Sequence, residues 1–221
     1  EKIPFLVGII CGGIKSRFFT EYLGGKVGVS RDNIRKPEFR VKDYKSTAGD
    51  YSFRCSDNLE NIESSIKMRT VGDMWGTGLF KANACDFCDD VTTELADISL
   101  GDAWIEPYNK DGLGTNVIIT RSILADYLIQ SGITKGKLQL ENLSPERVID
   151  SQQGSFNHRQ KGLNYRIKVA KSRGIPVPPK RIRSNNLNIF FRIVQKNRSI
   201  VRKSSIEIWK KNPSVYQFDL L

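Results

Sequence analysis

The chain has 221 residues, of which 39% are hydrophobic and 27% charged, a balance typical of a folded globular protein. Its apolar stretches fall short of the ~20 residues that a membrane-spanning helix needs, so the sequence predicts no transmembrane segment. Four cysteines are too few for a disulfide scaffold, and the first apolar stretch lacks a basic leader. We therefore expect a cytoplasmic protein with reduced thiols. Because the chain enters an apolar run directly after Glu1, we interpret it as the continuation of a longer polypeptide.

The net charge of +11 is distributed unevenly along the chain. Residues 158–221 hold 16 Lys and Arg and two acidic residues, which gives +14. Residues 1–157 hold the remaining 19 Lys and Arg and 22 acidic residues, which gives −3. This division predicts a mildly acidic domain over 1–157 and a basic appendage over 158–221.

Strands and helices are predicted in alternation over the first domain, which is typical of an α/β fold with a mixed sheet flanked by helices. The predicted strands cover 3–10, 38–44, 50–55, 96–104, 115–122 and 137–143, and the predicted helices cover 15–25, part of 59–80, 122–132 and 144–154. The segments 38–44 and 50–55 are expected to form a β-hairpin. Gly24 and Gly25 are expected to end the first helix, and Ser122 and Ser144 to cap two later ones.

The basic segment is predicted to be mostly helical. One helix is expected over 158–174, an extended break over 175–181 and a longer helix over 185–212. We expect the longer helix to pack through its apolar face, which consists of Leu187, Phe190, Phe191, Val194 and Val201. The basic side chains of this tail could face nucleic acid, an acidic partner, an anionic membrane surface or solvent, and no nucleic-acid-binding motif is present. They are Arg181, Arg183, Arg192, Arg198, Arg202 and Lys203.

Two of the four cysteines, Cys85 and Cys88, have a spacing at which both thiolates can reach one metal. The sequence lacks a second such pair or a His pair that would complete a zinc site, and the acidic residues that follow disfavour a reactive dithiol. Cys11, beside two glycines at a strand end, and Cys55, at the end of a hairpin strand, could add ligands from distant loops. On the residues alone, a metal or cluster site and four unrelated buried cysteines both stay open.

Two further groups are candidates for ligand contacts. Arg40 and Lys42 share one face of a predicted strand and could meet an anionic cofactor or solvent. Gly101 and Asp102 follow an apolar strand, where α/β folds place their sites, and a simple turn explains them equally well. The glycine-rich loop around Trp75 could approach a phosphate or a ring, or be only a flexible loop.

The segments VGIICGG, FRVKDY, DYSF, CDFCDDVTTELADISLGDAW and TNVIITRS, in this order, resemble the C-terminal domain of the coenzyme F-420 hydrogenase/dehydrogenase beta-subunit family over roughly residues 5–170. The resemblance implies an oxidoreductase that carries FAD and a 4Fe-4S cluster and passes electrons between a two-electron carrier and the cluster. The chain is also similar to relatives among polysaccharide-biosynthesis proteins, so a non-catalytic binding or scaffolding role is the alternative.

By this resemblance, Cys11, Cys85 and Cys88 are expected to be cluster ligands, and Cys55 is a weaker fourth candidate. The family's further cysteine and its ferredoxin-like run belong to an N-terminal part that this chain does not contain.

The flavin is expected to contact Arg40 and Lys42 through its anionic parts, with Gly101 and Asp102 closing over it. Expected partners are a flavin or deazaflavin and either a redox partner protein or an N-terminal ferredoxin-like domain. Nucleic acid is not an expected partner.

Overall fold

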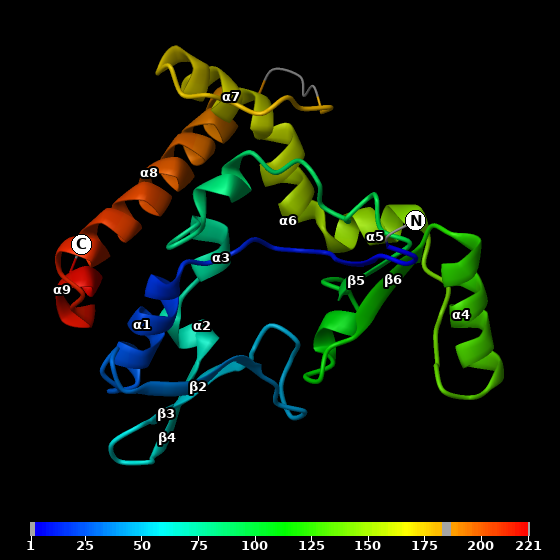
Figure 1. Ribbon diagram of the computed structural model, residues 1–221, viewed down its shortest axis with the longest axis horizontal. Coiled ribbons are helices and arrows are strands. Elements are labelled where there is room, and N and C mark those ends of the chain that lie inside the picture. Colours follow the sequence, from blue (N-terminus) through cyan, green and yellow to red (C-terminus); the bar gives the residue numbers. More distant parts are fainter. Residues whose placement is uncertain (1–2, 183–186, 221) are drawn as a thin grey trace.

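The computed structural model describes residues 3–182 and 187–220, and these form two small sheets with helices around them (Figure 1). The strands are β1 (Val7–Ile9), β2 (Ile34–Val41), β3 (Ser52–Asp57), β4 (Glu63–Lys67), β5 (Ile98–Asp102) and β6 (Asn116–Thr120). The α-helices are α1 (Arg17–Lys26), α2 (Met68–Val71), α3 (Met74–Thr77), α4 (Ile123–Thr134), α5 (Pro145–Ser151), α6 (Gln153–Phe156), α7 (Leu163–Ser172), α8 (Ile189–Lys211) and α9 (Val215–Asp219). Short 3-10 helices, η1 (Asn83–Asp86) and η2 (Tyr108–Lys110), and a π-helical segment, η3 (Asn157–Lys161), complete the elements. Arg183 lies outside the described residues.

The α/β class and the mixed sheet are confirmed. In that sheet β5 lies in the middle, parallel to β1 and antiparallel to β6. The predicted hairpin is also confirmed, because β2 pairs antiparallel with β3. It belongs to a second, antiparallel sheet with the order β2-β3-β4.

Two hydrophobic clusters hold the elements together. The larger one joins α1, β3 and the C-terminal helices, and its buried members are Phe19, Tyr22, Leu23, Val29, Phe53, Cys55, Met68, Phe80 and Trp209. The smaller one lies against the mixed sheet and is built on Ile10, Ala103 and Val117. One face of β1 is exposed, because Val7 and Ile9 point outward, whereas Gly8 between them is buried.

The C-terminal helices return to the start of the chain (Figure 1). From α7, α8 runs back toward α1, and α9 packs beside α1. The Tyr22 hydroxyl donates to Asp219 at 2.8 Å, and the Trp209 indole donates to Glu21 at 2.8 Å. Residues of the basic segment therefore share the main core. Among the described helices, none is long and apolar enough to cross a membrane.

Several sequence-based predictions are wrong in detail. Residues 137–143 form no strand, and α5 follows them directly. The segment 59–80, predicted as helix and loop, contains β4, which completes the second sheet. Gly24 and Gly25 lie inside α1, where a side chain on Gly24 would clash with Ile34 at 2.4 Å. Gly24 therefore serves close packing between α1 and β2 instead of ending the helix.

The predicted packing face of the longest helix is wrong at Phe190 and Val194, while Leu187, Phe191 and Val201 are partly buried. Phe190 is 77% exposed and Val194 is 42% exposed, whereas Gln195 and Ser205 are buried. The inner side of α8 thus includes polar residues as well as Trp209, and several apolar side chains in its first turns stay exposed.

Candidate functional site

Cys11 and Cys85 meet at the glycine turn that follows β1. The Gly13 amide donates to the Cys11 sulfur at 3.2 Å, and the next amide, that of Ile14, donates to the Cys85 sulfur at 3.3 Å. The turn is fixed against the chain ahead of η1, because the Ala82 amide donates to the Ile14 carbonyl at 2.8 Å. Two sulfur atoms therefore accept hydrogen bonds from adjacent amides of one turn.

Cys88 lies on the other side of η1, against η3. Its thiol donates to the Asp90 carbonyl at 3.4 Å, and the Arg159 guanidinium lies 3.6 Å from its sulfur. Arg159 also donates to the Asp90 carbonyl at 2.7 Å. The Nε atom of Arg159 is buried and has no hydrogen-bond partner among the described residues.

Cys55 occupies a different setting. It lies in β3, is 1% exposed, and belongs to the larger hydrophobic cluster. Burial, and then the nearby Asp57, raise the pKa of its thiol. These surroundings favour an unreactive packing residue, and its role as a fourth ligand stays a prediction.

Buried cations lie near Cys85 and the turn that carries Cys11. Lys81 is 7% exposed, donates to the Gly12 carbonyl at 3.3 Å, and runs so close to Gly13 that a side chain there would lie 2.5 Å from it. Burial, assisted by Lys81 and Arg198, lowers the pKa of Lys15 to about 7. Burial likewise lowers the pKa of Arg166 to about 10.

Carboxylates offset only part of this positive charge. Arg202 donates to the Asp86 carboxylate at 2.6 Å, and Arg166 donates to the Asp86 carbonyl at 2.8 Å. Burial is the main cause of the lowered pKa values, and neighbouring cations add to it, so a bound anion would be stabilised here. A group of thiolates, or an anionic cofactor that they bind, would supply the negative charge.

The structure also brings together the residues that were predicted to bind a cofactor. Arg40 of β2 forms an ion pair with Asp102 at the end of β5, and its guanidinium lies over the rings of Tyr51 and Trp104 at 5.3 and 5.0 Å. A side chain on Gly114 would lie 3.5 Å from Arg40 and 3.8 Å from Lys42, so both cations border the same loop. Two guanidinium nitrogens of Arg40, Nε and one Nη, are buried without a hydrogen-bond partner among the described residues.

Gly101 has a packing role in this arrangement. An added Cβ atom at this position would lie 2.5 Å from the Ile10 side chain. The glycine therefore lets β5 lie against the residue that precedes Cys11.

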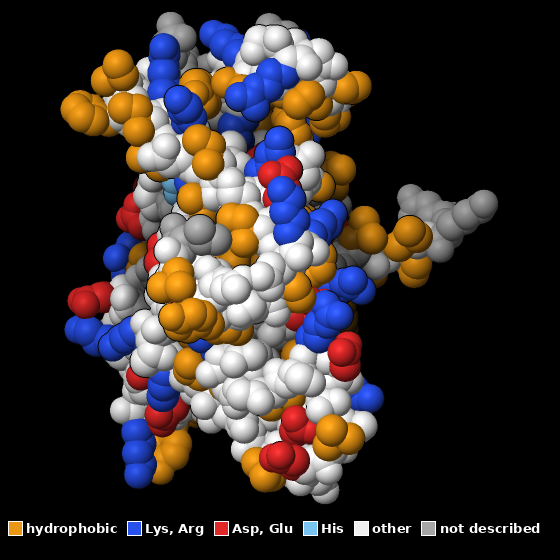
Figure 2. Space-filling view, turned by 90° about the vertical axis from the view of Figure 1, so that its left-hand side faces the viewer, with side chains coloured by type: hydrophobic (Ala, Val, Ile, Leu, Met, Phe, Trp, Pro, Cys, Tyr) orange, Lys and Arg blue, Asp and Glu red, His pale blue; other side chains and the backbone are white. Residues whose placement is uncertain are grey.

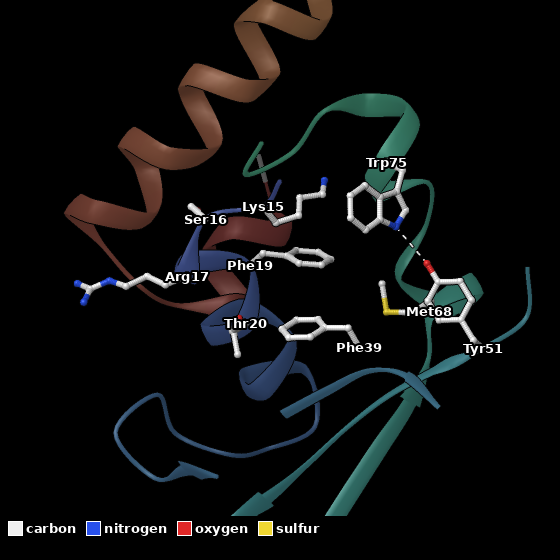
Figure 3. Close-up of a pocket in the computed structure, with 9 residues that line it drawn as sticks. All are labelled: Lys15, Ser16, Arg17, Phe19, Thr20, Phe39, Tyr51, Met68 and Trp75. Carbon is white, nitrogen blue, oxygen red and sulfur yellow. Dashed lines mark hydrogen bonds between the residues drawn. The ribbon is translucent and has the colours of Figure 1, made fainter. Parts of the chain in front are cut away.

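An aromatic pocket of about 330 Å³ lies between α1, β2 and the segment around Trp75 (Figure 3). Its lining residues are Lys15, Ser16, Arg17, Phe19, Thr20, Phe39, Tyr51, Met68 and Trp75. The Lys15 ammonium lies 4.8 Å from the Trp75 ring centre and 5.0 Å from that of Phe19. Tyr51, which stacks with Arg40, accepts a hydrogen bond from the Trp75 indole at 3.1 Å. A flat, anionic ring system would find aromatic walls and a cation in this pocket.

Comparison with known families identifies the chain. Residues 1–146 match the family described as the C terminus of the coenzyme F420 hydrogenase/dehydrogenase beta subunit. The chain belongs to this family. A search of curated proteins found no match.

The region matched to the F420 hydrogenase/dehydrogenase family contains all four cysteines and the pair formed by Arg40 and Asp102. Arg159, Arg166 and Arg198, which contribute to the positive interior, lie beyond it. The family is one of redox subunits, so the chain is an oxidoreductase-associated domain whose family context includes partner domains or subunits.

The chemistry of the residues around Cys11 suits an iron–sulfur cluster in part. Cys11 and Cys85 accept hydrogen bonds from amides, and Lys81, Arg159 and Arg166 are buried. These features suit an anionic cluster held by cysteines. In residues 3–182 and 187–220 no three Cys, His, Asp or Glu side chains lie close enough to enclose a metal ion. A cluster, which is larger than one ion, would therefore draw on the cysteine thiols and on a further ligand.

Proposed function

We propose that this chain is the redox domain of an oxidoreductase, in which a 4Fe-4S cluster held by Cys11, Cys85 and Cys88 exchanges electrons with a flavin. The observation that carries the proposal is that Cys11 and Cys85, from two distant segments, accept hydrogen bonds from adjacent amides of one turn, with Cys88 next along the chain beside the Arg159 guanidinium. When bound, the flavin would take up or release two electrons and the cluster one at a time.

The residues of the chain would prepare the cluster site in two ways. The amides of Gly13 and Ile14 donate to sulfur, which stabilises thiolates and holds them in position. The cations Lys81 and Arg159 offset negative charge in a region where water is largely excluded. Both effects favour binding of an anionic thiolate-ligated group.

The flavin would bind in the aromatic pocket, with its anionic parts toward Arg40 and Lys42. Phe19, Phe39 and Trp75 supply flat apolar walls, and Lys15 contributes a cation at the pocket's edge. Tyr51 supports this placement of the flavin, because it lines the pocket and its ring also contacts Arg40. The substrate would be a two-electron carrier such as a deazaflavin.

Replacing Cys85 and Cys88 together by Ser is expected to abolish cluster binding, because two of three proposed ligands are lost. Protein reconstituted anaerobically with iron and sulfide should show broad visible absorption, and the double variant should not. Cys55→Ala serves as the matched control and should retain this absorption. Retention of the absorption by the double variant would contradict the ligand assignment, and loss in Cys55→Ala would make Cys55 the fourth ligand.

Flavin binding is expected to depend on Trp75. Trp75→Ala should weaken FAD binding by about tenfold or more, since an aromatic stacking contact contributes ~1 kcal/mol beyond the area it buries. The measurement is quenching of flavin fluorescence on titration with protein, and Tyr216→Ala, an exposed aromatic far along the chain in α9, is the control. Equal affinities for the two variants would rule out this pocket. Purified protein without iron, sulfide or flavin would favour the non-catalytic alternative.

A further inference from the structure

The end of the molecule formed by α7 and the start of α8 carries strong positive charge. Residues 158–206 contain fourteen Lys and Arg and no Asp or Glu. Six of these cations are exposed and form no ion pair with any residue in 3–182 or 187–220. One is Lys161 in η3, and the five that lie in α7, just after it or in α8 are Lys168, Lys171, Arg173, Arg192 and Lys196. We refer to these five residues as the basic end.

Apolar side chains project from the same end. Ile189 is 69% exposed, Phe190 77% and Ile193 50%, and all three lie in the first turns of α8. Ile175, just after α7, is also exposed. Figure 2 shows hydrophobic and basic side chains next to one another at this end of the molecule. Several exposed apolar side chains close together indicate a contact surface.

The outward direction of these side chains is fixed by hydrogen bonds on the opposite side of α8. Gln195 is 1% exposed and accepts a hydrogen bond from Arg166, and Arg202 donates to Asp86 at 2.6 Å. Lower on the helix, Ser205 accepts from the Phe80 amide at 2.9 Å. Rotating α8 to bury Phe190 would break these contacts, so the apolar residues are held at the surface.

A hollow of about 360 Å³ lies between α7 and α8 within this surface. Lys168 and Arg192 border it from the two helices, together with the hydroxyl-bearing Tyr165 and Ser172. Cations and hydroxyl donors at a concave surface suit an anionic head group. The hollow therefore has the same preference for negative charge as the rest of the basic end.

We propose that the basic end binds an anionic membrane surface, with Phe190, Ile189 and Ile193 entering the interfacial layer and the cations contacting lipid phosphates. Cations combined with exposed aliphatic groups are typical of helices that lie on membranes. Nucleic acid would pair with the cations and stack on Phe190, but it would leave Ile189 and Ile193 exposed to water, whereas a lipid surface buries all three. The domain would thus carry out its chemistry at a membrane without crossing it.

Sedimentation with lipid vesicles tests this proposal. The full chain should sediment with vesicles of phosphatidylcholine and phosphatidylserine, not with phosphatidylcholine alone, and added salt should release it. Arg192→Gln with Lys196→Gln should weaken binding by about 30-fold, since each cation near an anionic surface contributes about fivefold. Phe190→Ser with Ile193→Ser should weaken it by about tenfold or more. Each variant is first checked for native circular dichroism.

The matched control changes the same charge at the other end of the helix. Lys210→Gln with Lys211→Gln should leave binding to phosphatidylserine vesicles within about twofold of the unchanged chain, because both residues lie away from the basic end. The proposal is overturned by absent binding, by equal binding to uncharged vesicles, or by equal losses in the control. A further result would also overturn it: the chain binds single-stranded DNA, and Phe190→Ser with Ile193→Ser binds vesicles as tightly as the unchanged chain.

Discussion

At the scale of single residues, the chemistry of this chain depends on where charge is buried. Lys15, Lys81 and Arg166 are largely withdrawn from water, and each has a lowered pKa. Cations in such surroundings destabilise the free protein and stabilise a bound anion. The same residues that would help to hold a thiolate-ligated cluster thus reduce the stability of the protein without one.

His158, the single histidine of the chain, provides a pH-dependent consequence. Burial, and then the charges of Arg198 and Arg166, lower its pKa from 6.5 to about 4. The unfolded chain therefore takes up a proton near pH 6.5, while the folded chain does so only near pH 4. The free energy of unfolding should be greatest above pH 6.5 and should fall as the pH is lowered toward 4.

Urea unfolding at about pH 7.5 and at about pH 5 measures this loss. His158→Gln keeps a hydrogen-bonding side chain without a charge, so its free energy of unfolding should change much less between the two pH values. Carboxyl groups with lowered pKa values, such as Asp97, lose their contribution to stability only below about pH 5. They therefore add little to the difference between the two measurements. The same loss in the variant and in the unchanged chain would contradict the assignment.

At the scale of elements, α8 is anchored by buried polar contacts. Ser205 is 2% exposed, and its hydroxyl accepts a hydrogen bond from the Phe80 amide at 2.9 Å. Ser205→Ala should lower the free energy of unfolding by about 1–3 kcal/mol, because the buried amide would lose its partner. Ser204→Ala, at the neighbouring half-buried position, should change it by about 0.5 kcal/mol or less. Equal effects in urea unfolding would show that the contact does not anchor the helix.

Helix boundaries with local signals could be predicted, and contacts between distant elements could not. Ser122 and Ser144 cap α4 and α5 as predicted, because each accepts from an amide three residues ahead. The prediction that Phe190 and Val194 pack inward was wrong, because periodicity defines a stripe of apolar residues but not what the stripe contacts. In α8, Gln195 and Arg202 had polar partners in the domain, which a single helix cannot reveal.

At the scale of the whole molecule, part of the candidate site followed from the sequence. The structure brings Cys11 close to Cys85 and pairs Arg40 with Asp102, and the roles of these residues as cofactor ligands stay predictions. The aromatic pocket was missed, because its lining comes from four separate elements and each aromatic residue alone resembles a core residue. Only Trp75, in a glycine-rich loop, carried a signal that could have pointed to it.

The return of α8 to the first helix makes a prediction about the whole molecule. Trp209 is 2% exposed, packs edge-on against Tyr22 and Phe80 at 5.7 and 5.8 Å, and donates to Glu21. Trp209→Ala should therefore lower the free energy of unfolding by about 3–5 kcal/mol, in one transition for the whole chain.

Phe190→Ala is the matched control, since it removes an aromatic ring from the same helix at a position that is 77% exposed. It should change the free energy of unfolding by about 0.5 kcal/mol or less. Urea unfolding followed by far-ultraviolet circular dichroism measures both variants. A small effect for Trp209→Ala, or a separate transition for the C-terminal helices, would mean that residues 158–221 fold independently of the domain. A large effect in a single transition means that the basic end is held rigidly by the same core that supports the cysteines and the aromatic pocket.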